Sequence, residues 1–196
     1  MQRAHVAVVA APVFLISIVG AAFAGVLPAS SIWSAAAVAW PPSTLLVSEL
    51  QTGGASASDE FAELTNVGPT AVDLNGLEVV YVTSTGGTIT RKASWATSTV
   101  LAPGRHLLIA NSLGIFASGA DATYSGGFVA TGGSIVLRVI GGAPIDSIGW
   151  GDATNAFVEG SAMAAPPPSS SIERKPGGIA GNTTDTNSNS TDWFAQ

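Results

Sequence analysis

The sequence predicts an all-β protein: an antiparallel β-sandwich of immunoglobulin-like size, preceded by an apolar N-terminal signal or anchor helix. The first observation is a series of short runs of strand length that are rich in β-branched and aromatic residues. The second is the turn chemistry between them, with Gly, Pro, Asn and Asp at the breaks. The third is composition, because only 10% of the 196 residues are charged and 23 are glycine, which does not suit a helical bundle.

The N-terminal segment predicts export. An uncharged apolar run covers residues 6–27 and follows Arg3. A basic residue before an apolar run is typical of a signal peptide, and the small-residue triplets that end at Ala24 and Ala39 both fit a cleavage site. The run is also long enough to span a bilayer as an uncleaved anchor. We therefore expect an exported protein, either extracellular or held at the cell surface.

These features divide the chain into three parts. Residues 1–24 are the predicted signal peptide or membrane anchor, with cleavage as late as residue 39 as the alternative. Residues 25–43 read as a spacer that ends near two prolines. Residues 44–196 form the predicted β-sandwich domain.

The predicted strands occur at short intervals, at residues 44–50, 60–66, 77–84, 105–111, 134–140 and 144–150. No amphipathic helix separates them, which indicates antiparallel pairing and argues against βαβ units. The last two form the clearest hairpin, because apolar residues alternate along the first of them and Gly141-Gly142 supplies a tight turn. We expect roughly seven to nine strands, as in immunoglobulin-like sandwiches.

The C-terminal part begins with three prolines, residues 166–168, that favour an extended conformation. A short segment at 170–174 follows, and a polar stretch then leads to Trp193 and Phe194. Two large aromatic side chains would lose burial energy in a free tail. We therefore expect them to form a last edge strand or a plug that docks on the sandwich.

Seven pieces of the sequence, taken in order, resemble the lamin-tail domain of exported prokaryotic proteins: Val47–Leu50, Asp59–Asn66, Val72–Gly76, Leu101–Asn111, Ile145–Gly149, Ser170–Arg174 and Asp185–Phe194. The resemblance covers about residues 44–196 and implies an immunoglobulin-like β-sandwich. Leu77 stands where the family usually has an aromatic residue, which preserves an apolar position. The resemblance implies framework roles for Glu49, Glu60, Glu63, Asn66, Asp73, Gly76, Glu173 and Arg174.

Glu60, Glu63 and Asp73 invite a second interpretation, a catalytic acid cluster. In a strand, Ala62 and Leu64 would face the core, leaving Glu63 on the other face. An Asp in a turn accepts backbone hydrogen bonds. Carboxylate catalysis needs paired acids beside a substrate groove or a metal, and the sequence marks neither. We therefore predict that the acids are structural and that the protein is not an enzyme.

Asp185, Asn187, Asn189 and Asp192 offer oxygen ligands in a spacing that resembles a calcium loop. The glycine and the closing glutamate of such a loop are missing, so an Asx-rich turn is the alternative interpretation. No cofactor is predicted, because the chain has no cysteine and His106 is the one histidine outside the leader. For the same reason we predict no other metal site.

Trp95, Trp150 and Trp193 are either a sugar-stacking platform or core residues. The net charge is −6, and without Arg3 the chain carries 6 basic and 13 acidic residues, a net charge of −7. No Lys/Arg cluster offsets this charge, so nucleic acid is disfavoured as a ligand.

The function that these features favour is adhesion, tethering or structural protein interaction at the cell surface, with an envelope protein or a glycan as the partner. Membrane contact would come through residues 6–27 if they are not cleaved. One alternative is a carbohydrate-binding module. Another is an accessory domain of an extracellular nuclease or phosphatase system, which lamin-tail modules accompany.

Overall fold

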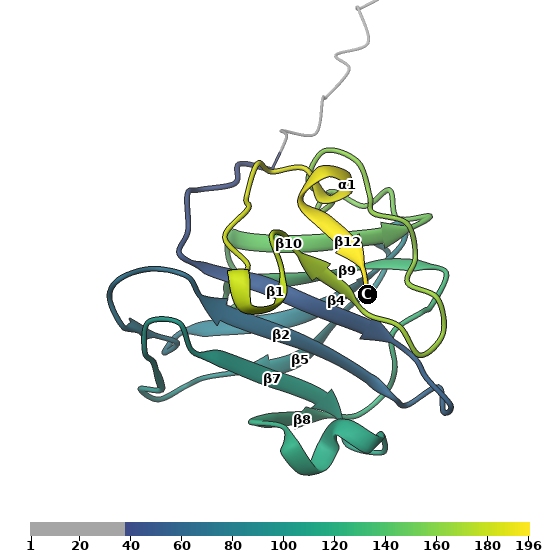
Figure 1. Cartoon of the computed structure of the whole chain (residues 1–196), viewed down its shortest axis with the longest axis horizontal. Helices are drawn as coiled ribbons and strands as arrows, with labels where there is room; N and C mark the ends of the chain where they lie inside the picture. The colour runs from purple at the N-terminus through teal and green to yellow at the C-terminus, as the bar shows by residue number, and fades with distance from the viewer. Residues whose placement is uncertain (1–37) are drawn as a thin grey trace, which may run out of the picture. The chain divides into compact units, whose positions relative to one another are not determined.

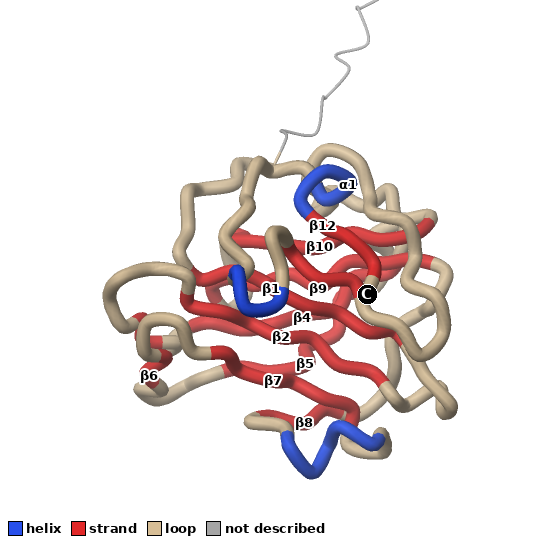
Figure 2. Tube along the Cα trace, viewed as in Figure 1, coloured by secondary structure: helices blue, strands red, loops and turns tan. Residues whose placement is uncertain are grey.

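The computed structural model describes residues 38–196, which fold into stacked, mostly antiparallel β-sheets (Figure 1). Strands and loops make up most of this part of the chain, and the helices are single short turns (Figure 2). The predicted signal or anchor segment, residues 1–24, lies outside the described residues. In residues 38–196 no helix is long and apolar enough to cross a membrane.

The larger sheet has six strands in the order β12-β11-β1-β2-β7-β8. Their bounds are Leu45–Thr52 for β1, Glu60–Asn66 for β2, His106–Asn111 for β7, Ala122–Tyr124 for β8, Ile172–Arg174 for β11 and Trp193–Ala195 for β12. All neighbours are antiparallel except β7 and β8. The register of β1 against β2 shifts between Val47 and Glu49, which places a bulge at Ser48.

The second sheet has four strands in the order β10-β9-β4-β5, all antiparallel. Their bounds are Leu77–Thr83 for β4, Ile89–Ser94 for β5, Gly132–Val139 for β9 and Pro144–Gly151 for β10. A separate small ribbon pairs β3 (Val72–Asp73) with β6 (Val100–Leu101). The helical turns are η1 (Ile115–Gly119), η2 (Gly178–Ala180) and α1 (Asn189–Asp192).

The predicted antiparallel sandwich is confirmed. Seven strands are six residues or longer, and the remaining five have only two or three residues. β5 was not among the predicted strands, because Arg91 and Lys92 give this segment a polar sequence. In the predicted β9–β10 hairpin, Gly141 adopts the positive φ of 64° that the turn requires.

The core lies between the two sheets and follows the alternation of the strands. Ala62 and Leu64 of β2 are buried there, as the sequence predicts. Phe61 points to the opposite face and is also buried, because the ring of Phe116 packs edge-on against it at a centroid distance of 4.9 Å. This contact fixes the loop after β7 on the outer face of β2.

The C-terminal segment is part of the larger sheet. β12 pairs with β11, so that Trp193 lies opposite Arg174 and is only 1% exposed. β11 in turn pairs with β1. The first strand of the domain therefore lies between β2 and a strand from the last 25 residues.

Candidate functional site

Glu60 lies inside the sandwich at the start of β2. Its carboxylate accepts hydrogen bonds from the Phe128 N–H at 2.7 Å and from Asn111 Nδ2 at 3.0 Å. Burial raises its pKa, although these bonds and nearby Lys92 act in the opposite direction. The buried carboxylate thus holds the loop before β9 against β2.

Lys92 of β5 completes this cluster. Its Nζ donates to the carbonyls of Gly126 and Gly127 at 3.1 and 3.2 Å and lies 4.5 Å from the ring centre of Tyr124. Burial lowers the pKa of Lys92, and Glu60 partly opposes that shift. Each of these polar groups bonds to another segment of the sandwich, so the cluster stabilises the fold.

Glu63 lies on the outer face of the larger sheet. Its Oε1 is 2.7 Å from His106 Nδ1 and accepts a hydrogen bond from Ser48 Oγ at 2.9 Å. Thr65 Oγ1 contacts the same His106 nitrogen at 2.9 Å. A Ser–His–acid triad needs one imidazole nitrogen for the hydroxyl and the other for the acid. The two contacts share one nitrogen, so this arrangement is not a catalytic triad.

Glu49 and Glu173 continue the acidic row beside Glu63, because Glu49 pairs with both of them across the strands. Burial raises the pKa of Glu49, and a hydrogen bond from Ser171 opposes the shift. Glu173 Oε1 accepts from the Gly178 N–H at 2.7 Å and from Asn182 Nδ2 at 2.9 Å, and its other oxygen contacts Gln196. Glu173 therefore anchors the η2 loop and the C-terminus.

A cavity of about 410 Å³ lies beside His106, between the larger sheet and the η2 loop. Thr65, Asn66 and Ile179 are among the residues that line it. Asn66 itself is structural, because its Nδ2 donates to the carbonyls of Thr70 and Leu101. The cavity therefore has a hydroxyl and an imidazole at its edge but no paired carboxylates poised for hydrolysis.

Asp73 and Gly76 shape the turn before β4. Asp73 Oδ1 accepts hydrogen bonds from the Asn75 N–H at 3.0 Å and the Thr99 N–H at 2.9 Å, and these bonds lower its pKa. Gly76 has φ of 82°, which favours glycine. Asp73 therefore stabilises its own turn and does not share a site with Glu60 or Glu63.

Arg174 is fully buried and joins three segments that are far apart in sequence. Its Nη2 donates to both carboxylate oxygens of Asp146, at 2.7 and 2.9 Å. Its Nε donates to the Val47 carbonyl at 2.9 Å, and Nη1 donates to the Thr184 carbonyl at 2.9 Å. The guanidinium also lies 5.0 Å from the ring centre of Trp193. Arg174 therefore connects β1, β10 and the C-terminal segment.

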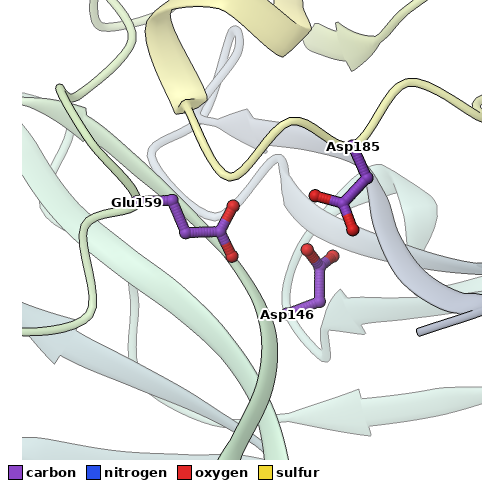
Figure 3. A group of neighbouring side chains, drawn as sticks. All are labelled: Asp146, Glu159 and Asp185. Carbon is purple, nitrogen blue, oxygen red and sulfur yellow. The ribbon is translucent and has the colours of Figure 1, made fainter. Parts of the chain in front are cut away.

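Three carboxylates converge beside this arginine: Asp146, Glu159 and Asp185 (Figure 3). One oxygen from each lies within 4.8 Å of the others. Burial raises the pKa of Asp146 to about 6 and that of Glu159 to about 8, and the nearby Asp146 carboxylate adds to the shift of Glu159. Arg174 already binds both oxygens of Asp146. The guanidinium thus supplies a cation to this group of acids, because it also lies 3.6 Å from Asp185.

The four predicted calcium ligands are not gathered around one point. Asn189 Oδ1 accepts from the Gly149 and Glu159 N–H groups at 2.8 and 3.1 Å. Asp192 accepts from the Thr186 N–H and hydroxyl, while Asp185 lies 3.6 Å from Arg174. The backbone of Asn187 has a positive φ of 56°, which places this residue in a turn. The segment is therefore arranged as an Asx-rich turn that closes on the arginine network.

A family model described as Lamin Tail Domain matches residues 39–152, which is more than half of the chain. The chain belongs to the lamin tail domain family. This match confirms the resemblance found in the sequence. A search of curated proteins found no match.

The lamin tail domain is an immunoglobulin-like binding or structural module and is not typically catalytic. Residues 153–196 of this chain follow the matched region, yet they supply β11 and β12 to the larger sheet. The three tryptophans considered above, Trp95, Trp150 and Trp193, do not form a platform. Trp150 and Trp193 are buried in the core, and Trp95 packs against it.

No role was predicted for five charged residues that the fold buries: Asp59, Glu78, Lys92, Asp146 and Glu159. Asp146 was detectable, because it shares a strand face with Ile148 and Trp150, both fully buried. On the outer face of the four-stranded sheet, Glu78 forms ion pairs with Arg91 and Arg138, in which the Nε–Oε distances are 2.5 and 2.8 Å. No local pattern marks Glu159, whose partner Asn189 is 30 residues away.

Proposed function

We propose that this lamin tail domain is an exported, non-enzymatic module that works at the cell surface by contact with proteins. The observation that supports this proposal is the uneven distribution of charge. The charged clusters described above are engaged in internal networks. One end of the sandwich, in contrast, presents uncharged loops and exposed apolar side chains.

That end, called the loop end here, consists of residues 51–58, 84–88, 111–120, 125–131 and 164–171. These loops meet there because β1, β4, β7 and β10 end at this side and β2, β5, β9 and β11 begin at it. None of the five contains Asp, Glu, Lys or Arg. Two exposed acids border these loops: Asp152 accepts a hydrogen bond from Ser84 Oγ at 2.6 Å, and Asp121 accepts one from the Leu108 N–H at 2.8 Å.

Protein interfaces are depleted of charge at their centres, so the loop end has the character of a contact surface. The described chain enters the domain at the opposite end, where β1 begins at Leu45.

Fractionation and N-terminal sequencing of the protein made in an exporting host test the proposed location. We expect either a mature chain that begins near Gly25 or Trp40 or a full chain in the membrane fraction. A full-length chain that is soluble in the cytoplasm would contradict export.

The non-enzymatic part of the proposal is tested on panels of glycan and phosphoester substrates. We expect no hydrolysis by the wild type, because the acids are engaged in separate networks. A hydrolytic activity that is lost in Glu63→Gln at an unchanged melting temperature would overturn it. Binding to a glycan array that does not depend on the loop end would favour the carbohydrate-binding alternative.

A further inference from the structure

Two large aliphatic side chains project from the loop end. Leu113 is 84% exposed and Ile115 is 72% exposed, in the loop between β7 and β8. Single exposed apolar residues are common on protein surfaces, but two so close together on an uncharged loop are unusual. Their exposure leaves apolar area in water that a partner could bury.

The backbone that carries these side chains is held firmly against the β1–β2 loop. A Cβ on Gly114 would lie 1.9 Å from the Ser58 carbonyl oxygen, so only glycine fits at this contact. The Ile115 N–H donates to Asp59 Oδ1 at 3.1 Å, and the neighbouring Phe116 packs on Phe61. The projection of Leu113 and Ile115 is therefore fixed by the fold.

An apolar cavity of about 270 Å³ opens on the other side of the same β1–β2 loop. Its lining contains no charged residue and includes Gly53, Gly54, Ala57, Ala130, Pro166 and Pro168. An apolar cavity of roughly 150 Å³ suffices to bind benzene, so this one has room for an aliphatic side chain. Ala57 lines the cavity and the next residue, Ser58, contacts Gly114. The projection and the cavity are therefore neighbours.

We propose that the loop end is a homodimer interface, in which Leu113 and Ile115 of one copy enter the apolar cavity of a second copy. Because projection and cavity lie side by side, a two-fold axis between them lets both copies exchange contacts at once, which closes the assembly as a dimer. The inference rests on the proposed function as a contact module and names its partner as a second copy of this chain.

Charge favours a second copy at this end rather than at another. The domain carries 6 basic and 13 acidic residues after Arg3 is set aside, so two copies repel one another in general. A dimer formed through the outer face of the larger sheet would place Glu49 and Glu63 opposite the same acids of the second copy. The loop end brings together loops without charged residues, which avoids this repulsion.

The test is sedimentation velocity of the purified full chain over a concentration range of about 1 to 200 µM. We expect a reversible monomer–dimer equilibrium that Leu113→Ser/Ile115→Ser weakens by about tenfold or more. Ile179→Ser is the matched control, because Ile179 is fully exposed on the η2 loop at the opposite end. Association through the N-terminal segment would be the same in all variants.

A second variant blocks the cavity and leaves the projection intact. Ala130→Trp is expected to weaken the dimer as the double serine variant does. A mixture of the two variants retains one of the two reciprocal contacts, so it is expected to form more heterodimer than either forms homodimer.

A wild-type chain that stays monomeric over this range would overturn the inference, as would a dimer that the double serine variant leaves intact. Equal weakening by Ile179→Ser would also overturn it. Failure of the proposed function is distinguishable from these results, because a cytoplasmic or hydrolytic protein could still dimerise through the loop end, and an exported contact module could remain monomeric.

Discussion

The two ends of the sandwich use polar and apolar side chains in opposite ways. Beside Val47 in the first half of β1, buried Arg174 binds Asp146 and contacts Asp192 of α1 and Trp193 of β12. At the loop end, Leu113 and Ile115 are exposed on a loop, residues 111–120, that contains no charged residue. The comparison shows that these buried charges bind other groups of the fold, whereas these two apolar side chains of the loop end are left in water.

Deleting residues 192–196 should have the largest effect. It removes buried Trp193, the β12 pairing and the Asp192 hydrogen bonds, so we expect a loss of roughly 5 kcal/mol in the free energy of unfolding. Thermal unfolding and limited proteolysis measure this. If proteases trimmed the intact protein to about Pro168 at an unchanged melting temperature, the C-terminal segment would not belong to the sandwich.

Arg174→Met should destabilise the domain by roughly 3–5 kcal/mol, because it leaves Asp146 buried without its partner. The double variant Asp146→Asn/Arg174→Met should recover part of that loss, since it removes the unpaired charge. Urea unfolding of both variants measures the difference. A double variant that is less stable than the single one would show that other contacts of Asp146, such as the Val47 N–H, dominate.

Stability should fall as pH rises from about 5.5 to 7.5. Glu159 and Asp146 have raised folded pKa values of about 8 and 6, so the folded state binds protons that the unfolded state has released. One extra proton bound to Glu159 over two pH units corresponds to about 3 kcal/mol, and Asp146 adds to this in the lower part of the range. Glu49 and Glu60, whose pKa values burial also raises, act in the same direction.

Urea unfolding across this pH range checks the expectation, and Glu159→Gln should flatten the profile. The lowered pKa values of Asp73 and Glu78 contribute stability that is lost only at more acidic pH, outside the window. Stability that rises from pH 5.5 to 7.5 would mean that Glu159 is ionised in the folded protein.

Glu60→Ala and Glu63→Ala should differ although the two acids are three residues apart. Glu60 is buried and serves Phe128, Asn111 and Lys92, so its loss should cost about 2 kcal/mol or more. Glu63 is partly exposed, and its pair with His106 should contribute less than about 1 kcal/mol. Equal losses in thermal unfolding would contradict this division.

The smallest effect on stability is expected for Leu113→Ser/Ile115→Ser. Both side chains are exposed, so the free energy of unfolding of the monomer should change by less than about 0.5 kcal/mol. Chemical unfolding at low protein concentration measures the monomer. A large loss would mean that the two side chains contribute to the fold, and the contrast between the two ends would then fail.

Alternation along the strands predicted much of this structure, as Ala62 and Leu64 illustrate. It did not predict β5, because the burial of Lys92 depends on carbonyls and rings from a loop more than 30 residues later. The acids at Glu60 and Glu63 were predicted as framework residues. Their environments could not be predicted, because a strand pattern does not show which loop closes over which residue. The Asp185–Asp192 spacing suggested a common ligand, whereas tertiary contacts draw Asn189 toward Glu159 and Asp185 toward Arg174.

The position of β1 has a consequence for the order in which the protein is made. Glu49, near the start of the domain, pairs with Glu173, near its end. The larger sheet cannot be completed until nearly all of the chain has left the ribosome, and such long-range pairing forms slowly. In the export that we propose, a chain that has not yet completed this sheet would pass through a translocation channel and fold on the far side.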